Sequence, residues 1–240
     1  MRAEALLFWL KAAAALSLII AALFFIRMVP AMGNKAEFVL DSSFNYRMTE
    51  AVLRGGDVPD PDTLSTYPVG KEIKKLLPTG MYHISAAFYR FLNIFAKVDL
   101  NHSILYLCAF FGALMALPLF GTSYAIYGDA RTALVTAFLG GIMPAYLNRS
   151  MCYWYRYETI AVPIVFASFF FFILAIKEKN GARALAYSAL SYMILTASLY
   201  VWRLAAVMLA VYTLTLLYLA FREDGFFKKR SGTLAATAAM

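Results

Sequence analysis

Two carboxylates, Asp41 and Glu158, are the main candidates for chemistry in this sequence. Asp41 lies in the segment Glu37-Phe-Val-Leu-Asp-Ser-Ser-Phe-Asn-Tyr-Arg47. An Asp just before a helix commonly caps it, so Asp41 is predicted to cap a helix over residues 42–54. A carboxylate is also a ligand that Mg²⁺ and Mn²⁺ prefer, and the two roles are compatible if they use different oxygens.

Glu158 ends the second candidate segment, Asn148-Arg-Ser-Met-Cys-Tyr-Trp-Tyr-Arg-Tyr-Glu158, and begins an apolar run. An acid in the first turn of a helix is favoured by the helix dipole. A carboxylate at the edge of hydrocarbon is costly unless it is paired, which favours a functional role instead. Two arginines, Arg149 and Arg156, flank it. The aromatic side chains of the segment are expected to form an interfacial belt: Tyr153, Trp154, Tyr155 and Tyr157.

The remaining polar motifs predict less chemistry. The segment Asp57-Val-Pro-Asp-Pro-Asp62 has part of a calcium-loop pattern but lacks its Gly and its twelfth-position Glu. It is therefore predicted to be a solvated turn. His83 and His102 are not at metal-ligand spacing from each other, so they predict no metal site.

The composition indicates that these segments belong to a membrane protein. Apolar residues make up 62% of the 240 residues and charged residues 15%, and the mean hydropathy is +0.66. Soluble domains have about 45–50% apolar and about 25% charged residues. Lipid must therefore solvate much of the chain, which excludes a soluble enzyme and a DNA-binding module. The net charge of +8 predicts orientation and contact with anionic headgroups rather than nucleic acid.

Uncharged stretches predict an all-α, polytopic fold with about six transmembrane helices. The first is interpreted as a retained anchor, because no cleavage site follows it. The predicted spans cover residues 12–26, 104–126, 132–148, 159–176, 184–202 and 204–221. A weaker apolar stretch, 76–96, contains Pro78, Gly80, His83 and Arg90.

The positive-inside rule decides whether the weaker stretch spans the membrane. Basic residues precede the first span and follow the last, so an even number of spans places both groups in the cytoplasm. Residues 76–96 are then predicted to lie against the outer face as an interfacial helix. The expected organisation is a first transmembrane helix (1–28), a large external loop (29–103), five further helices (104–221) with a second external motif (146–158), and a cytoplasmic segment in which a further span begins (222–240).

Several motifs, in order, resemble the N-terminal part of the catalytic subunit of oligosaccharyltransferase, the membrane enzyme of N-linked protein glycosylation. The segment Asp41-Ser-Ser-Phe-Asn-Tyr-Arg47 resembles its first-loop motif, and Thr66-Tyr-Pro-Val-Gly-Lys71 resembles a later part of that loop. Residues 77–82 resemble the start of its external helix, and residues 140–150 followed by Glu158-Thr-Ile-Ala161 resemble its third span and second loop. The likeness covers about Lys11 to Arg222. The family's late external loop and its acceptor-reading Trp-Trp-Asp-Tyr-Gly motif belong to a later part of its chain.

The resemblance implies a membrane glycosyltransferase that transfers an oligosaccharide from a polyprenyl or dolichyl (pyro)phosphate carrier to an Asn of an acceptor protein. Asp41 and Glu158 would be catalytic and would bind Mn²⁺ or Mg²⁺, which offsets charge on the leaving group. Arg47, Arg149 and Arg156 would contact the lipid carrier. The implied partners are membrane lipid, the carrier, the acceptor and other subunits. The short loops favour a prokaryotic plasma membrane, with the active face outside.

One departure keeps a second interpretation open. The family has Asp-x-Asp or Asp-x-Glu where this sequence has Arg156-Tyr-Glu158, so a permanent cation stands at a metal-ligand position. A non-catalytic relative that binds the lipid carrier would use Arg156 in an ion pair with Asp41 or Glu158. An unrelated transporter is a third alternative, but it would place acids at mid-membrane, and the six apolar runs hold none.

Overall fold

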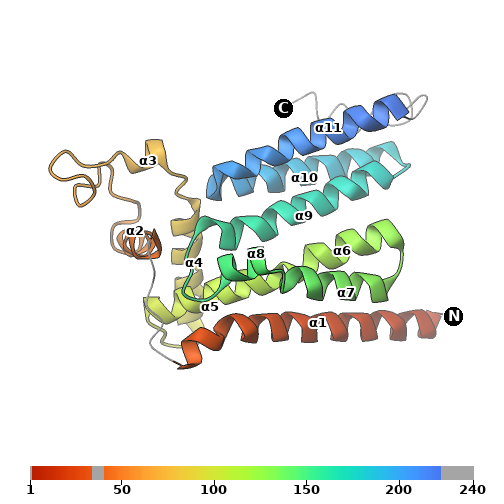
Figure 1. Ribbon diagram of the computed structural model, residues 1–240, viewed down its shortest axis with the longest axis horizontal. Coiled ribbons are helices and arrows are strands. Elements are labelled where there is room, and N and C mark those ends of the chain that lie inside the picture. The colour runs from red at the N-terminus through yellow and green to blue at the C-terminus, as the bar shows by residue number, and fades with distance from the viewer. Residues whose placement is uncertain (1, 34–40, 223–240) are drawn as a thin grey trace.

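Long apolar helices make up most of the computed structural model, which describes residues 2–33 and 41–222 (Figure 1). They form because lipid leaves backbone N–H and C=O groups no partner outside the helix. Within these two described ranges, four helices are long and apolar enough to cross a membrane. They are Glu4–Met32 in α1 (Arg2–Gly33), Leu100–Tyr127 in α5 (Leu100–Leu114) and α6 (Ala116–Tyr127), α9 (Tyr157–Lys177) and α10 (Gly181–Val201). The all-α, polytopic membrane fold is confirmed.

The predicted span over residues 132–148 is broken rather than continuous. It consists of α7 (Ala130–Gly141) and the short α8 (Pro144–Leu147) followed by η1 (Asn148–Ser150), bent by 52°. Pro144 has no N–H to donate, and the residue before a proline avoids the helical region. Met143 accordingly has a ψ of 123°. If the bent pair is one span, five helices can cross the membrane by length and composition.

At the last predicted span, the apolar helix is shorter than the four helices named above. The 3₁₀ turn η2 (Arg203–Ala206) leads into α11 (Val207–Arg222), and the apolar helix there covers Arg203–Leu219. The count of six spans therefore stays a prediction, as does the division of the chain at 28, 103 and 221. The segment 223–240, where a further span was expected to begin, lies outside the described residues, and so does Glu37.

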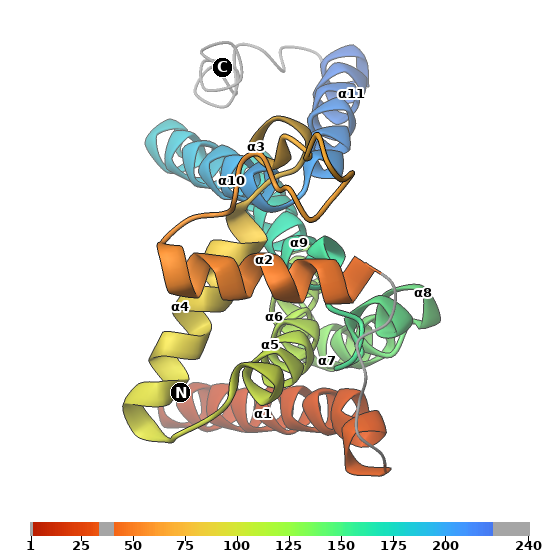
Figure 2. The ribbon, with the colours of Figure 1, turned by 90° about the vertical axis from the view of Figure 1, so that its left-hand side faces the viewer.

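Two helices from the long first loop cross one end of the bundle of long helices (Figure 2). They are α2 (Asp41–Gly55) and α4 (Gly80–Phe95), and the short α3 (Ile73–Leu76) lies between them in the chain. The predicted helix 76–96 begins at Gly80 because Pro78 holds Leu77 in an extended conformation, with a ψ of 143°. A shared core packs α2 and α4 onto the bundle, and it includes Met48, Met81, Leu107 and Ile160.

The connections between the long helices alternate between the two ends of the bundle. The end crossed by α2 and α4, here called the loop end, also carries α8 and the start of α9 (Figure 1). The opposite end, here called the turn end, carries the N-terminus of α1 and the α6–α7 and α9–α10 turns. Asp41 and Glu158 thus both lie at the loop end.

Candidate functional site at the loop end

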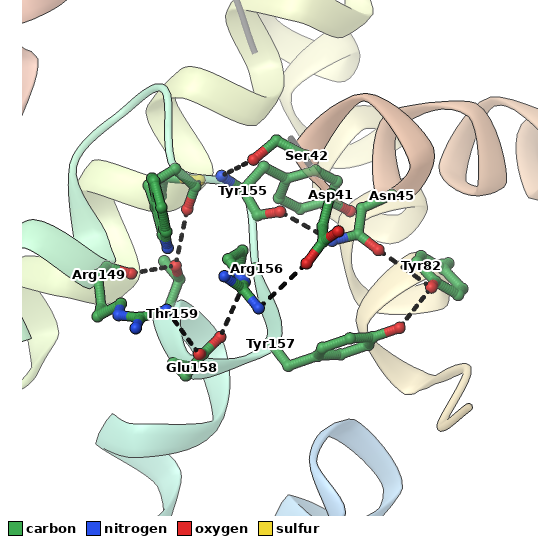
Figure 3. A network of polar contacts seen from close by, with 12 residues as sticks. Asp41, Ser42, Asn45, Tyr82, Arg149, Tyr155, Arg156, Tyr157, Glu158 and Thr159 are labelled. Carbon is green, nitrogen blue, oxygen red and sulfur yellow. Dashed lines mark hydrogen bonds and ion pairs between the residues drawn. The ribbon is translucent and has the colours of Figure 1, made fainter. Parts of the chain in front are cut away.

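The first turn of α2 is joined to the segment before α9 by hydrogen bonds to the backbone of Tyr155. The Tyr155 N–H donates to Ser42 Oγ at 3.1 Å, and Asn45 Nδ2 donates to the Tyr155 carbonyl at 2.9 Å (Figure 3). Because one residue's N–H and C=O are both held, α2 fixes the path of the chain on either side of Tyr155. Asp41 and Arg156 are immediate neighbours of these anchors.

A polar stripe on one face of α2 makes this junction possible. Residues three and four apart share a helix face, so Ser42, Asn45 and Thr49 point the same way. All three are buried. The Thr49 and Tyr155 hydroxyls lie 2.7 Å apart, and the Tyr155 hydroxyl donates to Ser85 Oγ of α4 at 2.6 Å.

Tyr82 of α4 completes the junction. Its hydroxyl donates to Asn45 Oδ1 at 3.2 Å and lies 2.6 Å from the Tyr157 hydroxyl (Figure 3). Burial, followed by the neighbouring Tyr157, raises the pKa of Tyr82 above its ordinary value of 10.0. The Tyr82 hydroxyl therefore stays neutral, and its hydrogen bonds link α4 to α2 and α9.

Four charged side chains meet beside this junction, in a row that we call the charge cluster: Asp41, Arg156, Glu158 and Arg149. Arg156 Nη2 lies 3.1 Å from Asp41 Oδ2, and its Nε lies 3.8 Å from Glu158 Oε2 (Figure 3). Arg149 Nη1 lies 3.4 Å from Glu158 Oε1. The structure therefore brings together four of the five predicted site residues, and Arg156 stands between the two acids.

Trp154 lies beside both arginines of the charge cluster. Its ring centroid is 5.4 Å from the Arg149 guanidinium carbon and 5.5 Å from that of Arg156. Such cation–π contacts favour a cation over an aromatic face. Thr159 Oγ1 also donates to the carbonyls of Arg149, at 2.9 Å, and Trp154, at 3.2 Å, which ties the loop to the first turn of α9.

The fifth predicted residue, Arg47, has a different partner. Its guanidinium binds Asp62 in a bidentate manner, with distances of 2.8 and 2.6 Å, and Ser65 Oγ donates to the same carboxylate at 2.5 Å. The hydrogen bonds from Arg47 lower the pKa of Asp62, and burial of the carboxylate opposes this shift. The resulting pKa is about 2. The expectation of a solvated turn is wrong for Asp62, whose side chain is only 2% exposed and is paired with Arg47.

The aromatic belt is also corrected in part. Tyr155 is fully buried, with its hydroxyl hydrogen-bonded inside the protein, rather than lying at a lipid surface. Ser42, Asn45 and Thr49 recur at helical spacing, and this pattern could have predicted a buried polar contact on one face of α2. The sequence did not indicate that Tyr155 would be the partner.

The residues of the charge cluster do not fit a bound divalent cation. Among the described residues, no group of three or more His, Cys, Asp or Glu side chains is placed to hold a metal ion. Asp41 and Glu158 supply only two carboxylates, and a guanidinium already lies at ion-pair distance from both. A second cation there would be repelled, so the predicted Mn²⁺ or Mg²⁺ site receives no support from this donor set.

Comparison with known protein families gives a match over most of the chain. The model of the STT3 oligosaccharyl transferase family, N-terminal part, matches residues 35–239. The chain belongs to this family. A dolichyl-diphosphooligosaccharide–protein glycosyltransferase subunit STT3B of Arabidopsis thaliana is 30% identical over 158 residues, which are 63% of this chain and 21% of that protein.

Solved structures of an archaeal oligosaccharyltransferase, from Archaeoglobus fulgidus, share the fold. Its apo form has a TM-score of 0.76 at 17% identity, over 95% of this chain and 29% of that one. Its complex with an inhibitory peptide and a dolichol-phosphate has a TM-score of 0.72 at 17% identity, over 96% and 29%. Its complex with Zn and sulfate has a TM-score of 0.68 at 18% identity, over 84% and 27%. This family member thus spans less than a third of the relatives that it resembles.

Proposed function

We propose that this protein acts in N-linked glycosylation at the loop end of its bundle, as the N-terminal membrane part of an oligosaccharyltransferase. It would hold a polyprenyl or dolichyl (pyro)phosphate-linked oligosaccharide there for transfer to an Asn of an acceptor protein. The loop end would face outward, as the basic residues of the turn end predict. The archaeal relative that was solved with a dolichol-phosphate and a peptide supports these two ligand classes.

The observation that carries this proposal is the convergence of Asp41 and Glu158 on Arg156. The two acids come from the first turns of α2 and α9, and the hydrogen bonds around Tyr155 hold α2 against the segment before α9. Arg149 is 46% exposed, so it offers a guanidinium for the phosphate of a lipid carrier. Asp41 is 66% exposed and is available to orient an acceptor amide.

A second candidate function is binding of the lipid carrier without transfer. Arg156 favours this function, because its ion pairs with both acids can hold the two helices together without supporting turnover. In this function the chain would present the carrier to another subunit, and Asp41 would only position Arg156.

Reconstitution of the full chain into lipid vesicles tests both functions. We would measure binding of dolichyl phosphate and, separately, transfer of glycan from a lipid-linked oligosaccharide to a labelled Asn-X-Thr peptide. Asp41→Asn should lower transfer at least tenfold, since it removes the charge that orients the amide. The matched control is Asp129→Asn, which makes the same change at the turn end and keeps a good helix cap for α7.

Each result discriminates between the candidates. Transfer by the wild type that depends on Asp41 supports the glycosyltransferase. Carrier binding without transfer supports the second function. Absence of both, in protein that unfolds cooperatively, would contradict the proposal.

A further inference from the structure

We propose that Arg156 is the built-in cation of the charge cluster: its guanidinium holds Asp41 and Glu158 in the place of a divalent metal ion. This inference deepens the proposed function and rests on it for the ligand, an anionic phosphate. The site would then bind that phosphate and position its two acids without a bound metal.

The position of Arg156 carries the inference. Its Nη2 and Nε face different carboxylates, Asp41 at 3.1 Å and Glu158 at 3.8 Å, so one side chain bridges acids from the first turns of α2 and α9. Glu158 Oε2 is buried, and no described residue donates a hydrogen bond to it. A buried carboxylate oxygen without such a donor is costly, and the neighbouring guanidinium charge is what offsets that cost.

The formal charges of the cluster already balance. Asp41 and Glu158 each bring one negative charge, and Arg149 and Arg156 each bring one positive charge. A divalent cation would leave this group with an excess of two positive charges at short range, unless it first displaced Arg156. A phosphate would add negative charge to the same balanced group, but Arg149 is 46% exposed and can turn donors toward a phosphate while it keeps Glu158.

The surroundings of Arg156 also restrict its movement. Trp154 lies against its guanidinium, and the anchored backbone of Tyr155 precedes it directly. The side chain is 28% exposed, so it is partly shielded from water but reachable from the external side.

Binding of Mn²⁺ to the chelator-treated full chain in zwitterionic nanodiscs tests the inference. We would measure free Mn²⁺ by electron paramagnetic resonance for the wild type, Arg156→Asp and Arg149→Asp. Arg156→Asp turns the bridge into a third carboxylate, so it should bind Mn²⁺ at least tenfold more tightly than the wild type. Adding Asp41→Asn should remove this gain.

Arg149→Asp is the matched control. It introduces the same acid on the other side of Glu158 but leaves Arg156 between the two carboxylates, so no gain in Mn²⁺ affinity is expected. Stoichiometric Mn²⁺ binding by the wild type that Asp41→Asn abolishes would overturn the inference. So would an Arg156→Asp protein that unfolds like the wild type but binds Mn²⁺ no better.

A second measurement needs no metal and covers the case in which Arg156→Asp fails to fold. Arg156→Gln should lower the midpoint of thermal unfolding, because it leaves two acids without their shared cation. Adding Asp41→Asn should restore part of that loss if the two side chains are coupled. A double variant whose loss equals the sum of the two single losses would contradict the bridging role.

These results are separable from the proposed function. Mn²⁺ binding and the thermal midpoint do not require the lipid carrier, so they report on Arg156 even if dolichyl phosphate fails to bind. Conversely, carrier binding by the wild type that persists in excess chelator is expected if both proposals hold. Carrier binding that chelator abolishes would overturn the built-in cation and leave the proposed function standing.

Discussion

Arg47 and Asp62 form an ion pair between two separate segments of the chain. The Arg47–Asp62 pair shows how strongly such a partner changes a residue. Two hydrogen bonds from one guanidinium hold the carboxylate of Asp62, which is almost fully buried. This pair ties α2 to the loop before α3, so it supports the helix on which Asp41 and Asn45 are carried.

Removal of Asp62 should cost stability in a pH-dependent way. The pKa of Asp62 is lowered from 3.8 to about 2, so its stabilising effect is complete above pH 3.8 and is lost as the pH falls toward 2. We expect Asp62→Asn to lower the free energy of unfolding by roughly 2 kcal/mol at pH 6, and the difference from wild type to shrink between pH 4 and pH 2. Equilibrium unfolding in mixed micelles measures both.

The matched control for this prediction is Asp60→Asn, an exposed acid in the same loop. Its effect should stay within about 0.5 kcal/mol, as for most surface substitutions. A stability difference for Asp62→Asn that is the same at pH 6 and pH 2 would contradict the role of the ion pair.

At the scale of elements, the packing of α1 against the break between α7 and α8 positions the loop that bears Arg149. Arg27 of α1 is fully buried and donates to Ser150 Oγ at 2.9 Å, to the Gly141 carbonyl at 2.7 Å and to the Leu23 carbonyl at 3.0 Å. Neutral oxygens at the end of α7 and in η1 therefore satisfy this cation. Gly112 of α5 lies in close contact with the Arg27 side chain.

Gly112→Ala should disturb this packing. A Cβ there would overlap Arg27 Nε and lie 2.6 Å from Arg27 Cδ and 2.9 Å from Ser150 Cβ. Overpacking of this kind costs about 1–3 kcal/mol, so we expect the free energy of unfolding to fall by that amount. Mixed-micelle unfolding measures it, and Gly181→Ala, where a Cβ meets open space, should show no such loss. Equal stability of the two variants would refute the close contact.

At the scale of the whole molecule, the connections between the described helices alternate between the two ends of the bundle, and the even number of crossings stays a prediction. The first loop and the segment before α9 lie at one end of the bundle, and the α6–α7 and α9–α10 turns lie at the other (Figure 1). Which end faces outward stays a prediction from the distribution of basic residues.

Cysteine labelling tests the sidedness. Thr63→Cys lies in the exposed loop before α3, and Asp129→Cys lies in the α6–α7 turn. The two native cysteines, Cys108 and Cys152, are buried and should react slowly. An impermeant maleimide should label Thr63→Cys in intact cells, and Asp129→Cys only after permeabilisation. The reverse order, or labelling of both from one side, would disprove the proposed orientation.

The sequence alone determined the class of the protein and the approximate location of its long apolar helices, but not the break between α7 and α8. Apolar runs long enough to cross lipid form helices wherever they occur, because the backbone must satisfy its own hydrogen bonds in hydrocarbon. Glu158 was identifiable because a charge at the edge of such a run is costly unless it is paired, and Arg149 and Arg156 because they flank it. Asp41 was identifiable because it precedes a predicted helix and because a carboxylate can also bind a divalent cation. An ion pair of Arg156 with one of the acids was also anticipated as an alternative.

Only the tertiary structure decided which charges meet. Arg47, adjacent in sequence to the α2 residues of the site, binds Asp62, whereas Arg156 bridges Asp41 and Glu158. The choice depends on how α2 docks on Tyr155 through Ser42 and Asn45, a contact between segments distant in the chain. Local sequence sets helix periodicity, but ion pairing depends on distances of a few ångströms that docking alone fixes.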